Sequence, residues 1–145
     1  MGLKSFKSWI FLDTILMIGI FLLLPVDTAH AQESLEVEVT VESMVVPQTG
    51  EVIVSGTVTC SEPTTGSLVI VVSQPVGRLK SISGESSTNV ACDENGEPYT
   101  LSVFASSGSF KPGTAVLEEV SFFACAPSGD CGGVELPPQA VTLRP

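Results

Sequence analysis

The stretch "EVIVSGTVTC", residues 51–60, places valine, glycine or cysteine at every second position. Side chains two residues apart on a β-strand lie on the same face, so this period predicts a strand with one face on a core. Cys60 shares the apolar face and is expected to point inward. The predicted inward residues are Val52, Val54, Gly56, Val58 and Cys60.

The segments around this strand predict further strands. "LEVEVTVE", residues 35–42, alternates strictly between apolar residues and polar ones, which are acidic except for Thr40. "SLVIVVSQ", residues 67–74, is apolar on both faces, as in a central strand whose outer side is partly covered. Clusters of Gly, Pro, Ser and Asn separate the other candidates, which are "GRLKSIS", "TNVAC", "YTLSVFA", "AVLEEVSFFAC" and "QAVTLR".

The spacing of these strands indicates the fold class. No stretch after residue 31 sustains a 3.6-residue apolar period, and short strands recur about every ten residues, as in sandwiches. We predict an all-β domain: a single antiparallel immunoglobulin-like sandwich of seven to eight strands with two disulfides. An antibody-type domain is not expected, because its core tryptophan is missing.

The N-terminal segment has the pattern of a secretory signal peptide. Lys4 and Lys7 precede an apolar stretch, residues 9–26, and Ala29-His30-Ala31 supplies a small-residue cleavage site. We therefore predict cleavage before Gln32. The alternative is an uncleaved membrane anchor, since the apolar stretch approaches the roughly 20 residues that span a bilayer.

Cleavage would leave one domain, residues 32–145, in a secreted protein without a stable membrane span. The only histidine, His30, and the only tryptophan, Trp9, would leave with residues 1–31. The remaining 114 residues suit a single domain. A monomer or a weak homo-oligomer is expected.

The charge balance of residues 32–145 limits the partners. Fourteen acidic residues stand against four basic ones, which are Arg78, Lys80, Lys111 and Arg144. A field of this sign repels phosphate backbones and anionic lipid, so we expect no nucleic-acid partner and no binding to a membrane surface. An unidentified extracellular or envelope partner is expected instead.

Four cysteines, Cys60, Cys92, Cys125 and Cys131, indicate a disulfide framework in an exported chain. Zinc is disfavoured because structural zinc sites use C-x2-4-C pairs, whereas the close pair here is C-x5-C. Cys125 and Cys131 flank a loop rich in turn formers, which favours their pairing and leaves Cys60 for Cys92. The rival pairing, Cys60 with Cys125, has the separation of an immunoglobulin inter-sheet bridge.

The residue inventory argues against catalysis. Without histidine, a triad lacks its usual base, and the only Ser and Lys arrangement is Lys80 beside Ser81 and Ser83, typical of a solvated strand. Glu36, Glu38 and Glu42 occupy outward positions of a strand and do not suggest a glycosidase pair. We predict a noncatalytic protein without a cofactor.

Two binding motifs are weighed against plainer interpretations. "CDENGEP", residues 92–98, gathers Asp93, Glu94, Asn95 and Glu97, whose oxygens could hold calcium, but an Asn-Gly turn explains the same letters and no metal is predicted. Sugar stacking has little support, since Tyr99 is the only tyrosine.

Apolar side chains on both faces of two strands raise the question of an exposed patch. Val69 and Val71 alternate with residues of the opposite face, and Phe122 and Phe123 are adjacent. Packing under a loop and a binding patch explain these positions equally well.

Several segments together resemble a family. "GTVTCS", "VIVVSQPVGR", "ACDENGEPYTLSV", "GSFKPGTAV" and a C-x5-C hairpin before "AVTLRP" are similar to small secreted proteins of actinomycete and related bacteria, a domain of unknown function. The resemblance covers residues 50–145 and implies an exported immunoglobulin-like module with the four cysteines as its framework, but no activity. A looser analogy in fold class is to neocarzinostatin-type apoproteins, which hold a small hydrophobic ligand.

The leading hypothesis is a noncatalytic secreted binding or interaction module. Its contact surface is expected on the loops at residues 61–66, 93–98 and 126–130. The alternatives are a secreted protease inhibitor that uses the disulfide-braced loop "CAPSGDC", and a carrier of a small hydrophobic ligand.

Overall fold

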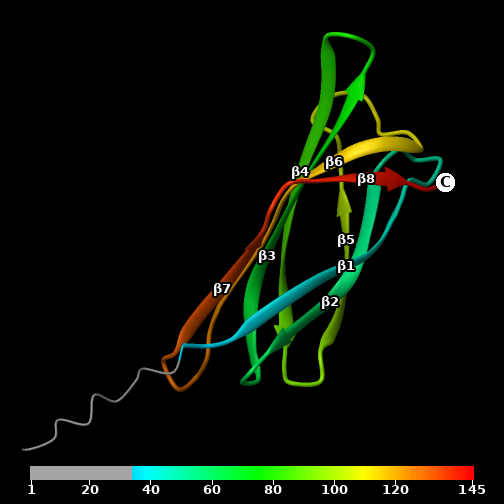
Figure 1. Ribbon diagram of the computed structural model, residues 1–145. Coiled ribbons are helices and arrows are strands. Elements are labelled where there is room, and N and C mark those ends of the chain that lie inside the picture. The colour runs from blue at the N-terminus through cyan, green and yellow to red at the C-terminus, as the bar shows by residue number, and fades with distance from the viewer. Residues whose placement is uncertain (1–33) are drawn as a thin grey trace, which may run out of the picture. The chain divides into compact units, whose positions relative to one another are not determined.

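The computed structural model describes residues 34–145, which fold entirely as β-strands and loops (Figure 1). They belong to one compact unit, Gln32–Pro145. The predicted signal peptide and its cleavage point lie outside the described residues, and within residues 34–145 no helix is long and apolar enough to cross a membrane. The strands are β1 (Val37–Val45), β2 (Val52–Cys60), β3 (Thr64–Val76), β4 (Lys80–Cys92), β5 (Glu97–Val103), β6 (Gly113–Cys125), β7 (Cys131–Leu136) and β8 (Gln139–Leu143).

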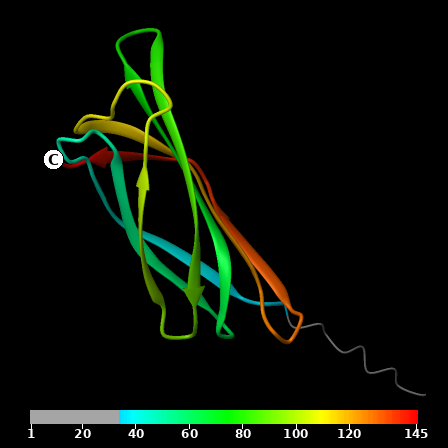
Figure 2. The same ribbon diagram turned by 180° about the vertical axis from the view of Figure 1, so that it is seen from behind.

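The strands form two antiparallel sheets, so the predicted all-β sandwich is confirmed (Figure 2). One sheet has the order β1-β2-β5, and the other has β4-β3-β6 with both β7 and β8 beside β6. In the constant-type immunoglobulin order the fourth strand lies next to the fifth. Here β4 pairs instead with β3 along thirteen residues, which makes a long hairpin.

Two of the predicted strand assignments were wrong. The first three residues of "GRLKSIS", 77–79, form the hairpin turn, and its remaining residues belong with "TNVAC" to one strand, β4. The strand is continuous because the polar and glycine residues 83–87 between the two segments stay paired with β3. β7 was not predicted, because "CGGVEL" has two glycines and little apolar surface; it is a strand because it pairs with β6 next to a disulfide.

β7 and β8 are two parts of one interrupted edge strand. Both pair with β6 in a continuous register, with Cys131 opposite Cys125 and Leu143 opposite Gly113. Pro137 and Pro138 separate the two parts. Proline has no N–H to give to a sheet, so the pair blunts this edge against further strand addition.

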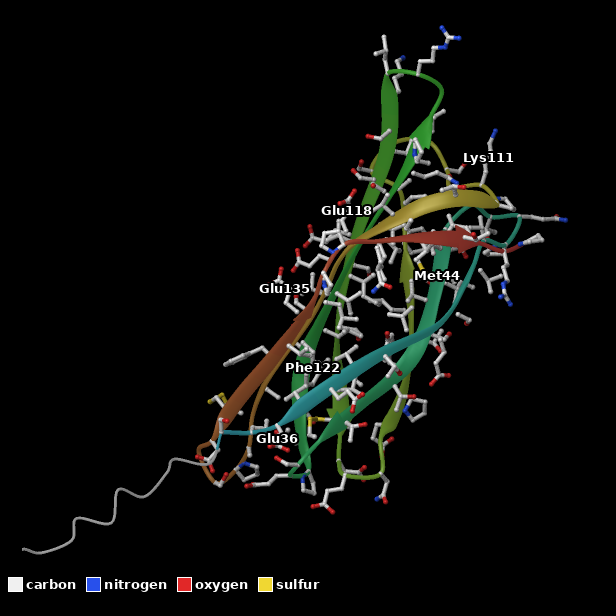
Figure 3. The ribbon with its side chains drawn as sticks, in the orientation of Figure 1. Glu36, Met44, Lys111, Glu118, Phe122 and Glu135 are labelled. Atoms are coloured by element: carbon white, nitrogen blue, oxygen red, sulfur yellow. A yellow bond between two sulfur atoms is a disulfide. The ribbon has the colours of Figure 1, made fainter. Side chains whose placement is uncertain are left out.

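β-Bulges explain why two strands change their inward phase. In β1 the register shifts between Val41 and Ser43, and the buried residue after the shift is Met44 (Figure 3). In β6 a bulge follows Leu117, and the buried positions resume at Val120. An extra residue on one strand moves every later side chain to the other face.

The core lies between the two sheets. The predicted inward face of β2 is confirmed, since its five residues from Val52 to Cys60 are buried. The loop between β5 and β6 adds Phe110, which is buried although it belongs to no strand. The largest fully buried side chains are Phe110, Phe122, Leu68, Ile70, Leu117, Leu143, Val52, Val54, Val58, Val72, Val103 and Val120.

Candidate functional site

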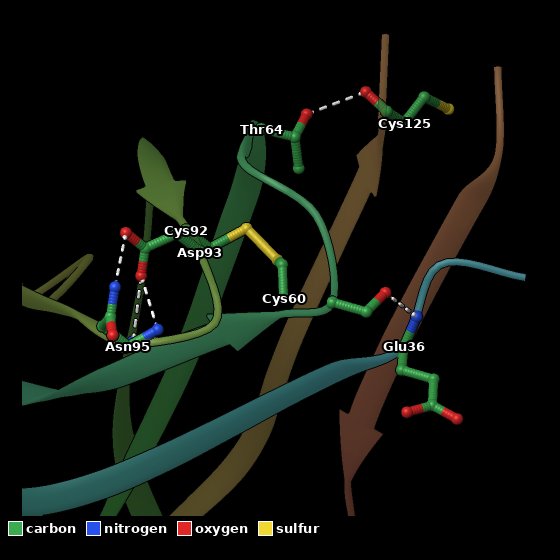
Figure 4. Close-up of a disulfide and its surroundings, with 9 residues drawn as sticks. Glu36, Cys60, Thr64, Cys92, Asp93, Asn95 and Cys125 are labelled. Atoms are coloured by element: carbon green, nitrogen blue, oxygen red, sulfur yellow. Dashed lines mark hydrogen bonds between the residues drawn. A yellow bond between two sulfur atoms is a disulfide. The ribbon is translucent and has the colours of Figure 1, made fainter. Parts of the chain in front are cut away.

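Both disulfides lie at one end of the sandwich, where β2, β4 and β6 finish. The structure has the pairing that the sequence favoured, Cys60 with Cys92 and Cys125 with Cys131, and not Cys60 with Cys125. The first bridge joins the last residues of β2 and β4, which belong to different sheets, and is buried (Figure 4). The cysteines therefore brace the fold. We call this region, with the loops 61–63, 93–96 and 126–130, the disulfide end.

The three segments predicted as a contact surface, residues 61–66, 93–98 and 126–130, meet at the disulfide end, although residues 64–66 and 97–98 belong to β3 and β5 and not to loops. The N–H of Cys60 donates to the Asp93 carbonyl at 3.0 Å, which joins the second loop to the first. Thr64 Oγ1 donates to the Cys125 carbonyl at 2.8 Å, which joins the first loop to the third (Figure 4). Any contact role for these loops stays a prediction.

The "CDENGEP" segment folds as the Asn-Gly turn. Asp93 Oδ1 accepts hydrogen bonds from the N–H groups of Asn95 at 2.8 Å and Gly96 at 3.1 Å. The carboxylate thus holds its own turn. Within residues 34–145, no three His, Cys, Asp or Glu side chains come together as metal ligands.

The "CAPSGDC" loop is a tight turn rather than an extended strand. The N–H of Ala126 donates to the Asp130 carbonyl at 2.7 Å, and that of Gly129 donates to the Ala126 carbonyl at 2.9 Å. Extended peptides bind clefts through free backbone N–H and C=O groups, and here the loop uses several of them internally. This geometry adds no support to the inhibitor hypothesis.

Acidic side chains concentrate at the disulfide end. A shallow hollow of about 360 Å³ lies there, and Glu36, Glu38 and Glu94 are among the residues that line it. These three glutamates are exposed, whereas Cys60, which also borders the hollow, is buried. A hydrogen bond holds one side of the hollow, since the backbone N–H of Glu36 donates to the side-chain Oγ of Ser61 at 3.1 Å (Figure 4). The acidic residues of this end are Glu36, Glu38, Glu62, Asp93, Glu94, Glu97 and Asp130.

The opposite end has the reverse charge. It consists of the β3–β4 hairpin tip, residues 75–81, the loop 104–112 and the turn 46–51, and we call it the hairpin end (Figure 1). Three of the four basic residues of the described range lie in these segments, and the fourth, Arg144, lies beside them because its carbonyl accepts the N–H of Val46 at 2.7 Å. Glu51 is the only acidic residue in these segments. The basic residues are Arg78, Lys80, Lys111 and Arg144.

The hairpin tip also exposes apolar side chains. Leu79 is 97% exposed and Val76 is 49% exposed, and in the loop beside the hairpin Phe104 is 67% exposed. Gly77 makes the turn possible with a φ of 71°, a conformation that glycine adopts without strain. All residues from 75 to 81 are exposed, so the tip extends beyond the core.

A buried glutamine ties the base of the hairpin to the neighbouring loop. Gln74 is the one buried residue of polar or charged type among the described residues. Its Nε2 donates to the Lys111 carbonyl at 2.7 Å, and its Oε1 accepts from the Lys111 N–H at 2.9 Å. These bonds orient Lys111 toward the hairpin end (Figure 3). A cleft of about 670 Å³, open to solvent, lies between Val76, Ile82 and Lys111.

Only some of the apolar residues that could form a patch on the larger sheet are exposed. Phe122 is buried in the core, whereas Phe123 is 59% exposed on the outer face. Val69 and Val71 also lie on the outer face and are half-buried. Ser67 and Ser121 interrupt this apolar surface, because they are the strand partners of Phe123 and Val69.

The candidate catalytic residues are not assembled into a site. Lys80 and Ser81 are consecutive residues of β4, so their side chains point to opposite faces. Ser83 uses its carbonyl to accept the N–H of Ser106 at 2.8 Å and is a strand position like the others. Glu36, Glu38 and Glu42 are exposed, as predicted for outward positions.

Tyr99 is a buried structural residue and is not available for stacking on a sugar. Its hydroxyl donates a hydrogen bond to the Thr40 carbonyl at 2.9 Å. This arrangement requires glycine at position 56, because a Cβ on residue 56 would collide with the same carbonyl. Burial, together with the nearby charge of Glu42, raises the pKa of Tyr99 to about 12.

Comparison with known proteins gives no match: no family model fits the chain, and no curated protein or solved structure matches it.

The sequence interpretation missed the hairpin tip as a candidate site. A signal was present, since "PVGRLK", residues 75–80, holds two of the four basic residues next to two aliphatic ones. The same letters also fit the start of a solvated strand, in which apolar and basic residues alternate. The contribution of Lys111 and Phe104 could not be found in this way, because both lie far away in the chain.

Proposed function

We propose that this protein is a noncatalytic extracellular binding module that engages its partner through the hairpin tip. The observation that carries the proposal is the grouping of exposed apolar side chains at the hairpin end, which has three of the four large ones of residues 34–145: Val76, Leu79 and Phe104. Leu79, which is 97% exposed, stands between two basic residues, Arg78 and Lys80. An apolar side chain so far from the core contributes nothing to folding, whereas burial against a partner gains about 25 cal/mol per Å². Basic groups around it add electrostatic selection of an acidic partner.

The scaffold suits such a role. The disulfide end holds the two sheets together, and a rigid scaffold that presents loops is a common arrangement for binding sites. Two disulfides are consistent with an extracellular protein, and secretion by cleavage before Gln32 is part of the proposal.

Site-specific photocrosslinking tests the proposal. A photoreactive amino acid would replace, in separate variants, Leu79 at the tip, Ser128 in the disulfide-braced loop and Ser87 on the outer face of β4, all of which are exposed. The variants would be irradiated with the surface fraction of the producing cells. We expect adducts from position 79 only; adducts from position 128 alone would place the contact on the disulfide end, as the sequence predicted, and would overturn the proposal.

A further inference from the structure

We infer that the partner of the hairpin tip is the acidic hollow at the disulfide end of a second copy of this chain. The inference rests on the proposed function, since it needs the tip to be a contact surface. The two surfaces have opposite charge and shape: the tip is a projection with Leu79 between Arg78 and Lys80, and the hollow is a shallow depression beside the exposed residues Glu36, Glu38 and Glu94. Shape and charge therefore match.

The hollow has a size and rigidity suited to one projecting side chain. At about 360 Å³ it is at the small end of the range of binding pockets and has room for one projecting side chain. The Asp93 turn fixes the backbone beside Glu94, and the Ser61 bond fixes Glu36. A surface that is ordered before contact loses little entropy on binding.

The two surfaces cannot meet within one molecule. They lie at opposite ends of β3, whose thirteen residues extend about 43 Å at about 3.3 Å per residue. The overall negative charge of the chain does not prevent the contact between two copies, because most of the acidic side chains are far from the tip. At physiological ionic strength charges are screened within about 8 Å, so the tip responds to the glutamates it faces and not to the net charge.

A contact between different ends of identical chains is heterologous. It leaves one tip and one hollow free in every dimer, so it can continue into chains or close into a ring. The tip has few residues, which makes the interface smaller than those of stable complexes. We therefore expect association that is weak, depends on concentration and decreases with salt.

The test uses charge reversal with matched controls in sedimentation equilibrium. Arg78→Glu disables the tip, and Arg144→Glu makes the same charge change elsewhere at the hairpin end. Glu94→Lys disables the hollow, and Glu85→Lys makes the same change on β4. All four side chains are exposed, so the variants should fold.

We expect the average mass of the wild type to rise with concentration. The self-association of each disabling variant should be at least about tenfold weaker than that of the wild type. Both control variants should associate like the wild type. An equimolar mixture of Arg78→Glu and Glu94→Lys should form dimers and nothing larger, because each retains one intact surface. A wild-type mass that stays monomeric, or a mixture that does not dimerise, overturns the inference.

The outcome can be separated from failure of the proposed function. If the wild type is monomeric but position 79 still crosslinks to a different protein, the second copy is wrong and the binding role of the tip is retained. Vesicles of phosphatidylglycerol provide a further arm: sedimentation with them that is lost in Arg78→Glu, without self-association, would assign the tip to an anionic membrane and overturn the inference.

Discussion

The two ends of this sandwich differ in how they are held and in what they present. At the disulfide end two covalent bridges and backbone hydrogen bonds join three loops, and acidic side chains surround a shallow hollow. At the hairpin end no cysteine is present; a buried glutamine and Phe110 hold the loops, and basic and apolar side chains project. Covalent bracing and an acidic hollow are thus at one end of the domain, and the basic side chains and the projecting hairpin tip are at the other.

The largest expected effect comes from removal of the inter-sheet bridge. Replacing Cys60 and Cys92 together by alanine should lower the free energy of unfolding by about 4 kcal/mol, because the bridge closes a 32-residue separation. The matched pair Cys125→Ala and Cys131→Ala, with a separation of 6, should lose about 2 kcal/mol. Denaturant unfolding under oxidising conditions measures both, and equal losses would contradict the comparison.

The hairpin end is stabilised by apolar packing, whereas the other end is stabilised by disulfide bonds. Phe110→Ala should lower the free energy of unfolding by about 3 kcal/mol, since it empties a buried site that the loop fills. Phe104→Ala is the control, because Phe104 is exposed in the same loop and should change stability by less than about 0.5 kcal/mol. Denaturant unfolding of the two variants measures the change in the free energy of unfolding. Similar losses in both variants would mean that the buried position of Phe110 does not make it more important for stability than Phe104.

Between the two ends, Tyr99 makes stability depend on alkaline pH. Its pKa is 10.0 in an unfolded chain and about 12 here, so it stabilises the fold fully below pH 10 and loses this contribution as the pH rises toward 12. Tyr99→Phe should lose about 1 kcal/mol at pH 7 through the unpaired Thr40 carbonyl. Rapid unfolding measurements should show a smaller decline for the variant between pH 10 and 12; parallel declines would contradict the assignment.

The smallest effect on stability is expected at the hairpin tip. A substitution there distinguishes most clearly a contact surface from a part of the fold that contributes to stability. Leu79→Ser should change the free energy of unfolding by less than about 0.5 kcal/mol, because the side chain is almost fully exposed. The same variant should lose the self-association measured by sedimentation. A clear loss of stability would show that Leu79 belongs to the fold and not to a contact surface.

The bridge between Cys125 and Cys131 and the inward face of β2 could be predicted from the sequence because both depend on neighbours. Strand alternation has a period of two residues, and the cysteines flank a short loop. β7 and the continuity of β4 could not be predicted, since their glycines and serines have weak strand preference and are held by partners distant in the chain. The bulges escaped prediction for the same reason, because a register shift is defined only against a second strand.

The sequence by itself determined an acidic all-β sandwich with two disulfides, because apolar period, composition and cysteine spacing are properties of the chain. Only the tertiary structure decided that the four basic residues gather at one end and seven acidic residues at the other. The physical reason is that antiparallel strands bring residues as distant as Arg78 and Lys111 to the same end of the sheets, and the sheet pairing that does so is not written in either local sequence.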